Sequence, residues 1–121
     1  MNNEALELTV AAARAAEDKL AHDISVRDVG EIFGISESFV IVSARSDRHV
    51  QSVVKGIDDA LREQFGRKPI RIEGREDASW VLLDYGDIIV HVFLDETRSF
   101  YDLDRLWSDA PAVEWAVPAS L

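Results

Sequence analysis

Three histidines and one pair of aspartates are the residues of this 121-residue chain whose types could do chemistry. His22, His49 and His91 are not four residues apart, and none stands in a metalloprotease-type pattern. Asp102 and Asp104 form an Asp-x-Asp pair, which we expect to be two solvated surface acids on a short helix. The chain has no cysteine, which excludes disulfides, thiolate metal sites and cysteine nucleophiles. The sequence predicts neither a metal nor a cofactor.

Nucleotide and acyl-transfer chemistry are also disfavoured. The junction between a predicted strand and a predicted helix, residues 43–47, contains none of the glycines that a phosphate-binding loop requires. No serine stands in a Gly-x-Ser-x-Gly turn. We therefore expect the protein not to be an enzyme.

His91 differs from the other two histidines because it interrupts an apolar run from Ile88 to Phe93. A polar ring on a strand is usually a core or cross-strand residue with a hydrogen-bond partner. The alternative is a place on an exposed binding face, and both interpretations stay open at this point. We expect His22 at a helix end and His49 at a helix start, both at the surface.

Acidic residues concentrate in the segment from Glu76 to Asp109, which has nine acids against two bases, Arg98 and Arg105. The whole chain carries a formal net charge of −10. Such a charge repels the phosphate backbone, so we expect no direct nucleic-acid readout. An acidic segment is complementary to a basic protein surface. A surface that only keeps the protein in solution is the alternative.

Length and patterning predict one domain without a membrane span. The N-terminus lacks the basic and apolar regions of a signal peptide, and no apolar run approaches the roughly 20 residues of a span. We expect a cytoplasmic protein with a domain over residues 1–110 and an irregular C-terminal tail over 111–121, which contains Pro111 and Pro118.

Hydrophobic periodicity predicts a helix, two strands and a second helix in the first half. The helix spans 4–22, is capped by Asn2 or Asn3, and has a stripe of apolar residues at Leu6, Val10, Ala13 and Leu20. Strands follow at 24–29 and 39–44, with a turn at 34–38 between them. A helix at 47–65 begins after Ser46, ends at Gly66, and has its stripe at Val50, Val53, Val54, Ile57, Leu61 and Phe65.

The second half reads as strands followed by a helical piece. A strand spans 69–72 and is broken by Gly74. Strands at 80–84 and 88–94 are joined by Tyr85-Gly86-Asp87 as an antiparallel hairpin, and a short helical piece follows Asp95. The order α-β-β-α-β-β-β-α predicts an α/β single domain with one mixed five-stranded sheet flanked by helices. This order resembles the nucleotidyltransferase topology, without the Gly-Ser turn and strand carboxylates of its catalytic motif.

Two segments together resemble the ribosomal silencing factor (RsfS, Iojap-like) family. Ser79–Phe93 matches its Trp, its Asp-x-Gly turn and its Val-His-x-Phe strand, and Thr97–Trp107 is similar to its Arg-x-Phe-Tyr-x-Leu-x-x-Leu-Trp ending. Asp28 and Ser43–Ser46 also fit, so the resemblance covers roughly residues 4–109. Tyr85 and Asp87 in the turn stand at positions that vary within the family.

The resemblance implies a regulatory function. Members bind the large ribosomal subunit through ribosomal protein L-fourteen, a basic protein, at the face where the small subunit docks. Occupying that face blocks subunit joining and represses translation in stationary or nutrient-limited cells. Free members can form homodimers. Two further hypotheses stay open, a degenerate nucleotidyltransferase-like enzyme and a non-ribosomal protein-interaction module.

Five residues are the candidates for contact with the partner. Alternation along the strand places Trp80, Leu82 and Asp84 on one face, and His91 lies close by on the neighbouring strand. Tyr101 follows in the acidic helical piece. The alternative for Trp80 is a core position, and the alternative for Tyr101 and Trp107 is packing of the last helix on the sheet.

The missing phosphate loop and metal pair lead to the first prediction. A nucleoside triphosphate with Mg²⁺ should bind no tighter than about 1 mM in isothermal titration calorimetry, because nothing in the chain cradles phosphates. Saturable micromolar binding accompanied by turnover would overturn the expectation that the chain is not an enzyme.

Overall fold

The computed structural model describes residues 1–30, 34 and 36–115 of the chain. Its elements are α1 (Asn3–Asp18), β1 (His22–Asp28), β2 (Ser38–Ala44), α3 (Asp47–Phe65), β3 (Arg71–Glu73), β4 (Trp80–Asp84), β5 (Ile88–Leu94), α4 (Asp95–Tyr101) and α5 (Leu103–Leu106). The strands form one sheet in the order β1-β2-β5-β4-β3. Only the central β2–β5 pair is parallel, so the mixed five-stranded sheet expected from the sequence is confirmed.

Helix α3 forms where its sequence signals predict it. The side chain of Ser46 accepts a hydrogen bond from the backbone N–H of His49, which satisfies one of the free donors at the helix start. Gly66 ends the helix at φ 65°, a left-handed conformation that a glycine adopts without strain. The predicted stripe is buried against the sheet from Val50 to Leu61, whereas Phe65 is only partly buried.

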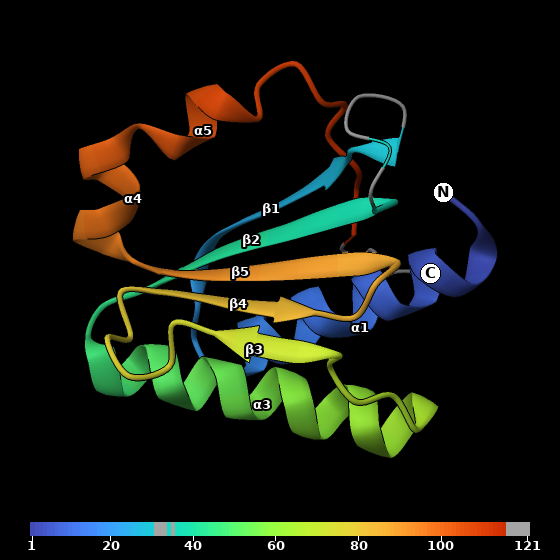
Figure 1. Cartoon of the computed structure of the whole chain (residues 1–121), viewed down its shortest axis with the longest axis horizontal. Helices are drawn as coiled ribbons and strands as arrows, with labels where there is room; N and C mark the ends of the chain where they lie inside the picture. Colours follow the sequence, from blue (N-terminus) through green and yellow to red (C-terminus); the bar gives the residue numbers. More distant parts are fainter. Residues whose placement is uncertain (31–33, 35, 116–121) are drawn as a thin grey trace, which may run out of the picture.

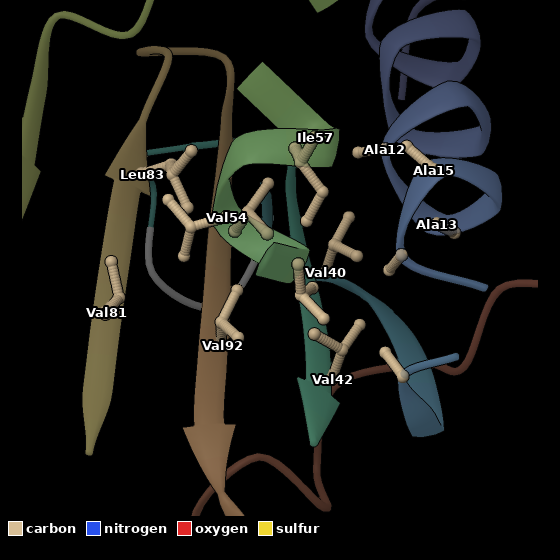
Figure 2. Packing of buried hydrophobic residues seen from close by; sticks show 14 of the residues in the cluster. Ala12, Ala13, Ala15, Val40, Val42, Val54, Ile57, Val81, Leu83 and Val92 are labelled. Atoms are coloured by element: carbon tan, nitrogen blue, oxygen red, sulfur yellow. The ribbon is translucent and has the colours of Figure 1, made fainter. Parts of the chain in front are cut away.

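The buried face of α1 is different from the predicted stripe. Leu6 and Leu20 are exposed, and Val10 is partly buried. Of the predicted stripe, Ala13 is fully buried as expected; the helix otherwise buries Leu8 and Thr9 together with small side chains, namely Ala5, Ala12, Ala15 and Ala16. Alanine allows close approach of the helix to α3 and to β2, as Ala12, Ala13 and Ala15 show in Figure 2. The pattern of larger apolar residues therefore pointed to the wrong face.

The first helix also ends earlier than expected, at Asp18 rather than at residue 22. The N–H of Ala21 bonds to the carbonyl of Ala16, and Leu20 turns the chain with φ 65°. Such a helix end normally has glycine at the left-handed position, and here leucine occupies it without any sequence signal. His22 accordingly lies in β1 rather than at a helix end, where its Nε2 is 2.6 Å from Asp95 Oδ1.

Helices α1 and α3 cover one face of the sheet, while α4 and α5 lie on the other (Figure 1). The main core lies between the sheet and α1 and α3, where alternate residues of the central strands meet Val54 and Ile57 (Figure 2). None of the helices in the described part of the chain is long and apolar enough to cross a membrane.

A smaller core lies on the opposite face of the sheet. Ile41 of β2 and Phe93 of β5 are fully buried there beneath Trp107, which follows α5 and is 4% exposed. We call residues 95–110, which bring Trp107 over the sheet, the arm. Of the two interpretations left open for Trp107, the structure therefore shows packing on the sheet. The side chains that β4 and β3 present on this face, Trp80, Leu82, Asp84, Arg71 and Glu73, are called the open half, because each is at least partly exposed.

Arg98 attaches the arm to the sheet. Its Nη1 donates to the backbone carbonyl of Asp23 at 2.6 Å and to Ser43 Oγ at 2.8 Å, and its Nη2 donates to Asp104 Oδ1 at 2.8 Å. The side chain is only 9% exposed. Asp102 and Asp104 both lie at the surface, as expected, but neither is only solvated, because Asp104 pairs with Arg98 and Asp102 pairs with Arg105 at 4.0 Å.

The remaining differences from the predicted elements are at their ends. Strand β3 spans Arg71–Glu73 rather than 69–72, and the single expected helical piece is divided into α4 and α5. Residues 111–113 are attached to β1, since the N–H of Asp28 bonds to the carbonyl of Pro111 and the N–H of Val113 bonds to that of Val26. Ile35 of the predicted turn and residues 116–121 of the predicted tail lie outside the described residues.

The anchoring role of Arg98 can be measured. We expect Arg98→Leu to lower the free energy of unfolding by about 2–4 kcal/mol, because Ser43 and the Asp23 carbonyl lose a charged donor. Arg105→Leu is the matched control: that arginine is also in the arm but is 86% exposed, and its loss should change stability by less than about 0.5 kcal/mol. Urea unfolding of both variants tests this. Equal free energies of unfolding for the Arg98→Leu and Arg105→Leu proteins would show that Arg98 does not hold the arm.

Candidate partner-binding site

The open half brings together three of the five candidate residues. Trp80, Leu82 and Asp84 alternate with the buried Val81 and Leu83, so they share the face that points away from α1 and α3. Cross-strand pairing sets Leu82 opposite His91, and Trp80 opposite Phe93. The predicted common face is therefore present, with His91 next to it.

Trp80 is neither a core residue nor a free surface residue. It is 37% exposed, and its ring lies 4.8 Å from that of Phe93, between centroids. The indole Nε1 donates a hydrogen bond of 3.1 Å to His91 Nδ1. The side chain is therefore held by two partners while more than a third of it remains accessible.

His91 is buried, with 4% exposure, so it offers almost no surface for contact. Burial lowers the pKa of His91 to about 4, because the charged ring would lose its hydration. At neutral pH the ring is uncharged, and since Nδ1 accepts from Trp80 the proton resides on Nε2. Among the described residues no acceptor bonds to that Nε2.

Aromatic rings surround His91 on this face. Phe39 packs edge-on at 4.8 Å between centroids, Trp107 lies at 5.3 Å, and Phe93 is stacked at 6.1 Å. Strands β2 and β5 and the arm each supply part of the cluster. Trp80 forms its outer margin, where the cluster meets the open half.

Asp84 is already engaged within the chain. Its Oδ1 accepts from the N–H of Gly86, which shapes the hairpin turn, and its Oδ2 accepts from Arg71 Nε at 3.2 Å. Only 16% of its side chain is exposed. A carboxylate with these partners contributes to the shape and charge of the open half, but has little free capacity to bind a basic side chain.

Tyr101 lies on α4, in the arm, and is not part of the open half. It is 61% exposed and packs edge-on against Phe100, which is 81% exposed. The expected alternative of packing on the sheet is wrong for Tyr101. The structure therefore separates the candidates into a group on the sheet and a single residue on the arm.

The described residues contain no group of three or more His, Asp or Glu side chains that could hold a metal ion. A polar hollow beside α4 is lined by His22, Asp23, Asp95, Arg98 and Asp104, with Ser43, Ser99 and Asp102. Within it, Arg98 pairs with Asp104, and His22 contacts Asp95.

The sequence analysis did not predict the roles of three residues, Phe39, Phe93 and Arg98. Phe93 could have been found, because it is two residues from His91 and must share its face. Phe39 required knowledge that β2 and β5 are neighbours, since that pair is brought together by a crossover. Nothing local marks Arg98 as buried, because its three acceptors come from distant positions or from α5.

Comparison with known proteins gives the family. Residues 2–120 match the protein family described as "RsfS: Ribosomal silencing factor during starvation". The chain belongs to this family. A Bacillus subtilis protein named "Ribosomal silencing factor RsfS" is 40% identical over 114 residues, which are 94% of each chain.

Two further relatives of this silencing factor family member extend the comparison. The mouse protein "Mitochondrial assembly of ribosomal large subunit protein 1" is 32% identical over 90 residues, covering 73% of this chain and 40% of that protein. A crystal structure of a Chromobacterium violaceum protein superimposes with a TM-score of 0.81 at 30% identity, covering 99% of this chain and 97% of the other. The α/β fold is thus the fold of the solved relative.

The buried, neutral His91 predicts a pH-dependent stability. In the unfolded chain its pKa returns to about 6.5, so below that pH the unfolded state binds a proton that the folded state binds only near pH 4. Folding stability should therefore fall by up to about 3 kcal/mol between pH 6.5 and 4. Urea unfolding of the wild type and of His91→Phe across this range isolates the effect. Parallel pH profiles of the two proteins would contradict it.

Proposed function

We propose that this protein binds the large ribosomal subunit through ribosomal protein L-fourteen and sterically blocks joining of the small subunit, which represses translation. The open half is the proposed contact surface, with Trp80 and Leu82 as its apolar part and Asp84 with its neighbours as its charged part. Tyr101 is proposed to contact the partner from the arm. His91 contributes through Trp80. Membership of the silencing factor family and the names of the relatives support this function.

The observation that supports the surface most strongly is the partial exposure of Trp80 beside a face that the chain's own helices leave uncovered. Tryptophan is among the residues that most often dominate binding energy at interfaces. A specific complex buries roughly 1,200–2,000 Å² in total, of which about half comes from each partner. This chain exposes 7067 Å² in all, so the complex would cover about 600–1,000 Å² of its surface.

Charge supports the choice of a basic partner. The net charge of −10 is attractive to a basic ribosomal protein and repulsive to the surrounding RNA. Electrostatic attraction acts mainly on the association rate, while buried aromatic contacts mainly set the dissociation rate. Blocking then needs no chemistry, since a bound protein of 13.5 kDa excludes the small subunit from the same surface.

Co-sedimentation tests the proposal. The protein should migrate with isolated large subunits in a sucrose gradient and be absent from joined ribosomes, because the small subunit and the protein exclude each other. Adding it before the small subunit should also slow subunit joining, measured by light scattering. Equal recovery with joined ribosomes would contradict steric exclusion.

Two variants test whether Trp80 contacts the large subunit. Trp80→Ala should weaken binding to the large subunit by about 2 kcal/mol or more, as expected for an interface anchor. Leu20→Ala, at an apolar residue that is 79% exposed in the turn between α1 and β1, is the matched control and should bind normally. Thermal unfolding of both variants, recorded alongside, separates a lost contact from a lost fold.

A further inference from the structure

The indole of Trp80 makes its one hydrogen bond within the protein. An indole has one polar hydrogen, on Nε1, and no acceptor. That hydrogen is donated to His91 Nδ1. His91 is buried, so a partner cannot take over this hydrogen bond by approaching His91 from outside.

What Trp80 presents outward is therefore ring carbon. The N–H edge of the indole points toward His91, and its ring packs against Phe93. The 37% of the residue that stays exposed is left with the π surface and the carbon edge of the indole.

The acceptor that fixes the indole is itself held firmly. Phe39, Phe93 and Trp107 pack around the imidazole of His91. The lowered pKa keeps the ring neutral at physiological pH, which leaves the lone pair on Nδ1 free to accept. The ring thus acts as a fixed acceptor that orients Trp80.

We infer that His91 is a positioning residue that turns the indole of Trp80 so that its ring surface receives a lysine or arginine side chain of the partner. This inference rests on the proposed function and names the chemistry of its central contact. The partner group stacks on the ring and makes no hydrogen bond to the indole.

The charge of the surroundings selects a cation. The face of an indole is the most attractive of the aromatic faces for a cation, and partial desolvation strengthens the interaction. The open half holds two acids, Glu73 and Asp84, against one base, Arg71, which is paired with both, so its formal net charge is −1. A phosphate or a carboxylate would need the indole N–H, which is occupied. The contact therefore favours a protein side chain over RNA.

Two substitutions of Trp80 distinguish ring surface from hydrogen bond, with isolated large ribosomal subunits as the probe at pH 7. Trp80→Phe keeps a π surface but loses the N–H that His91 orients, so it should weaken binding by about fivefold, as His91→Phe does. Trp80→Leu loses the π surface as well and should weaken binding by about twentyfold or more. Equal losses in the two variants would show that the π surface makes no contribution, and normal binding of the leucine variant would exclude a cation. Either result overturns the inference.

A double-mutant cycle tests the role of His91. His91→Phe keeps a buried aromatic ring but removes the acceptor, and it should weaken binding by about fivefold or more in the wild-type background. In the Trp80→Phe background, which has no N–H to orient, the same change should have almost no effect on affinity. A purely structural His91 would weaken binding equally in both backgrounds, which would overturn its positioning role. Trp80→Phe alone and the double variant should have similar melting temperatures if the comparison is valid, and affinities are compared well below both.

The binding measurements test the proposed function and the inference separately. If the wild-type protein does not bind large subunits, the proposed function fails and the inference fails with it. If the wild type binds and the two His91→Phe effects are equal, the proposed function stands and only the inference fails.

Discussion

The guanidinium of Arg98 joins segments that are far apart in the sequence, and the exposed surface of the sheet depends on this junction. Through one buried cation, α4 is bonded to the Asp23 carbonyl, to Ser43 of β2 and to Asp104 in α5. This arrangement brings Trp107 over Phe39, His91 and Phe93. The arm thereby completes the aromatic cluster from one side and leaves β4 and β3 accessible on the other. Hydrogen bonds to a buried charge are among the stronger ones in proteins, which suits a single residue to this task.

The aromatic cluster around His91 contributes both to the stability of the fold and to the proposed binding surface. Its inner members are buried and hold the sheet and the arm together, while Trp80 at its margin is both packed and accessible. A side chain that is already ordered loses little conformational entropy on binding, so an anchor prepared in this way favours affinity. The neutral state of His91 serves both purposes, because a charged ring there would be costly to bury and could not accept from the indole.

The predicted helices and strands match the structure best where the hydrophobic period and the capping or turn residues indicate the same element. Helix α3 has a regular stripe, a serine cap and a terminal glycine, and the β4–β5 hairpin has alternating residues around a turn. Helix α1 was predicted, but it ends four residues earlier than expected, and its buried side consists mainly of Leu8 and alanines rather than of Leu6 and Leu20. The common face of Trp80, Leu82 and Asp84 follows from strand alternation. The Trp80–His91 bond and the buried Arg98 depend on strand pairing and on the path of the arm, which no local pattern encodes.

The central claim is that the open half of the sheet docks on the large subunit, and site-specific photo-crosslinking tests it most directly. A benzophenone amino acid at position 82 replaces Leu82 in the open half. The control carries the same group at Gln51, an exposed residue of α3, which lies on the other side of the sheet. Each labelled protein is irradiated with purified large subunits, and the crosslinked ribosomal protein is identified by mass spectrometry. The account predicts one dominant crosslink from position 82 to a basic large-subunit protein, and none from position 51. A crosslink from position 51 with none from position 82 would contradict it.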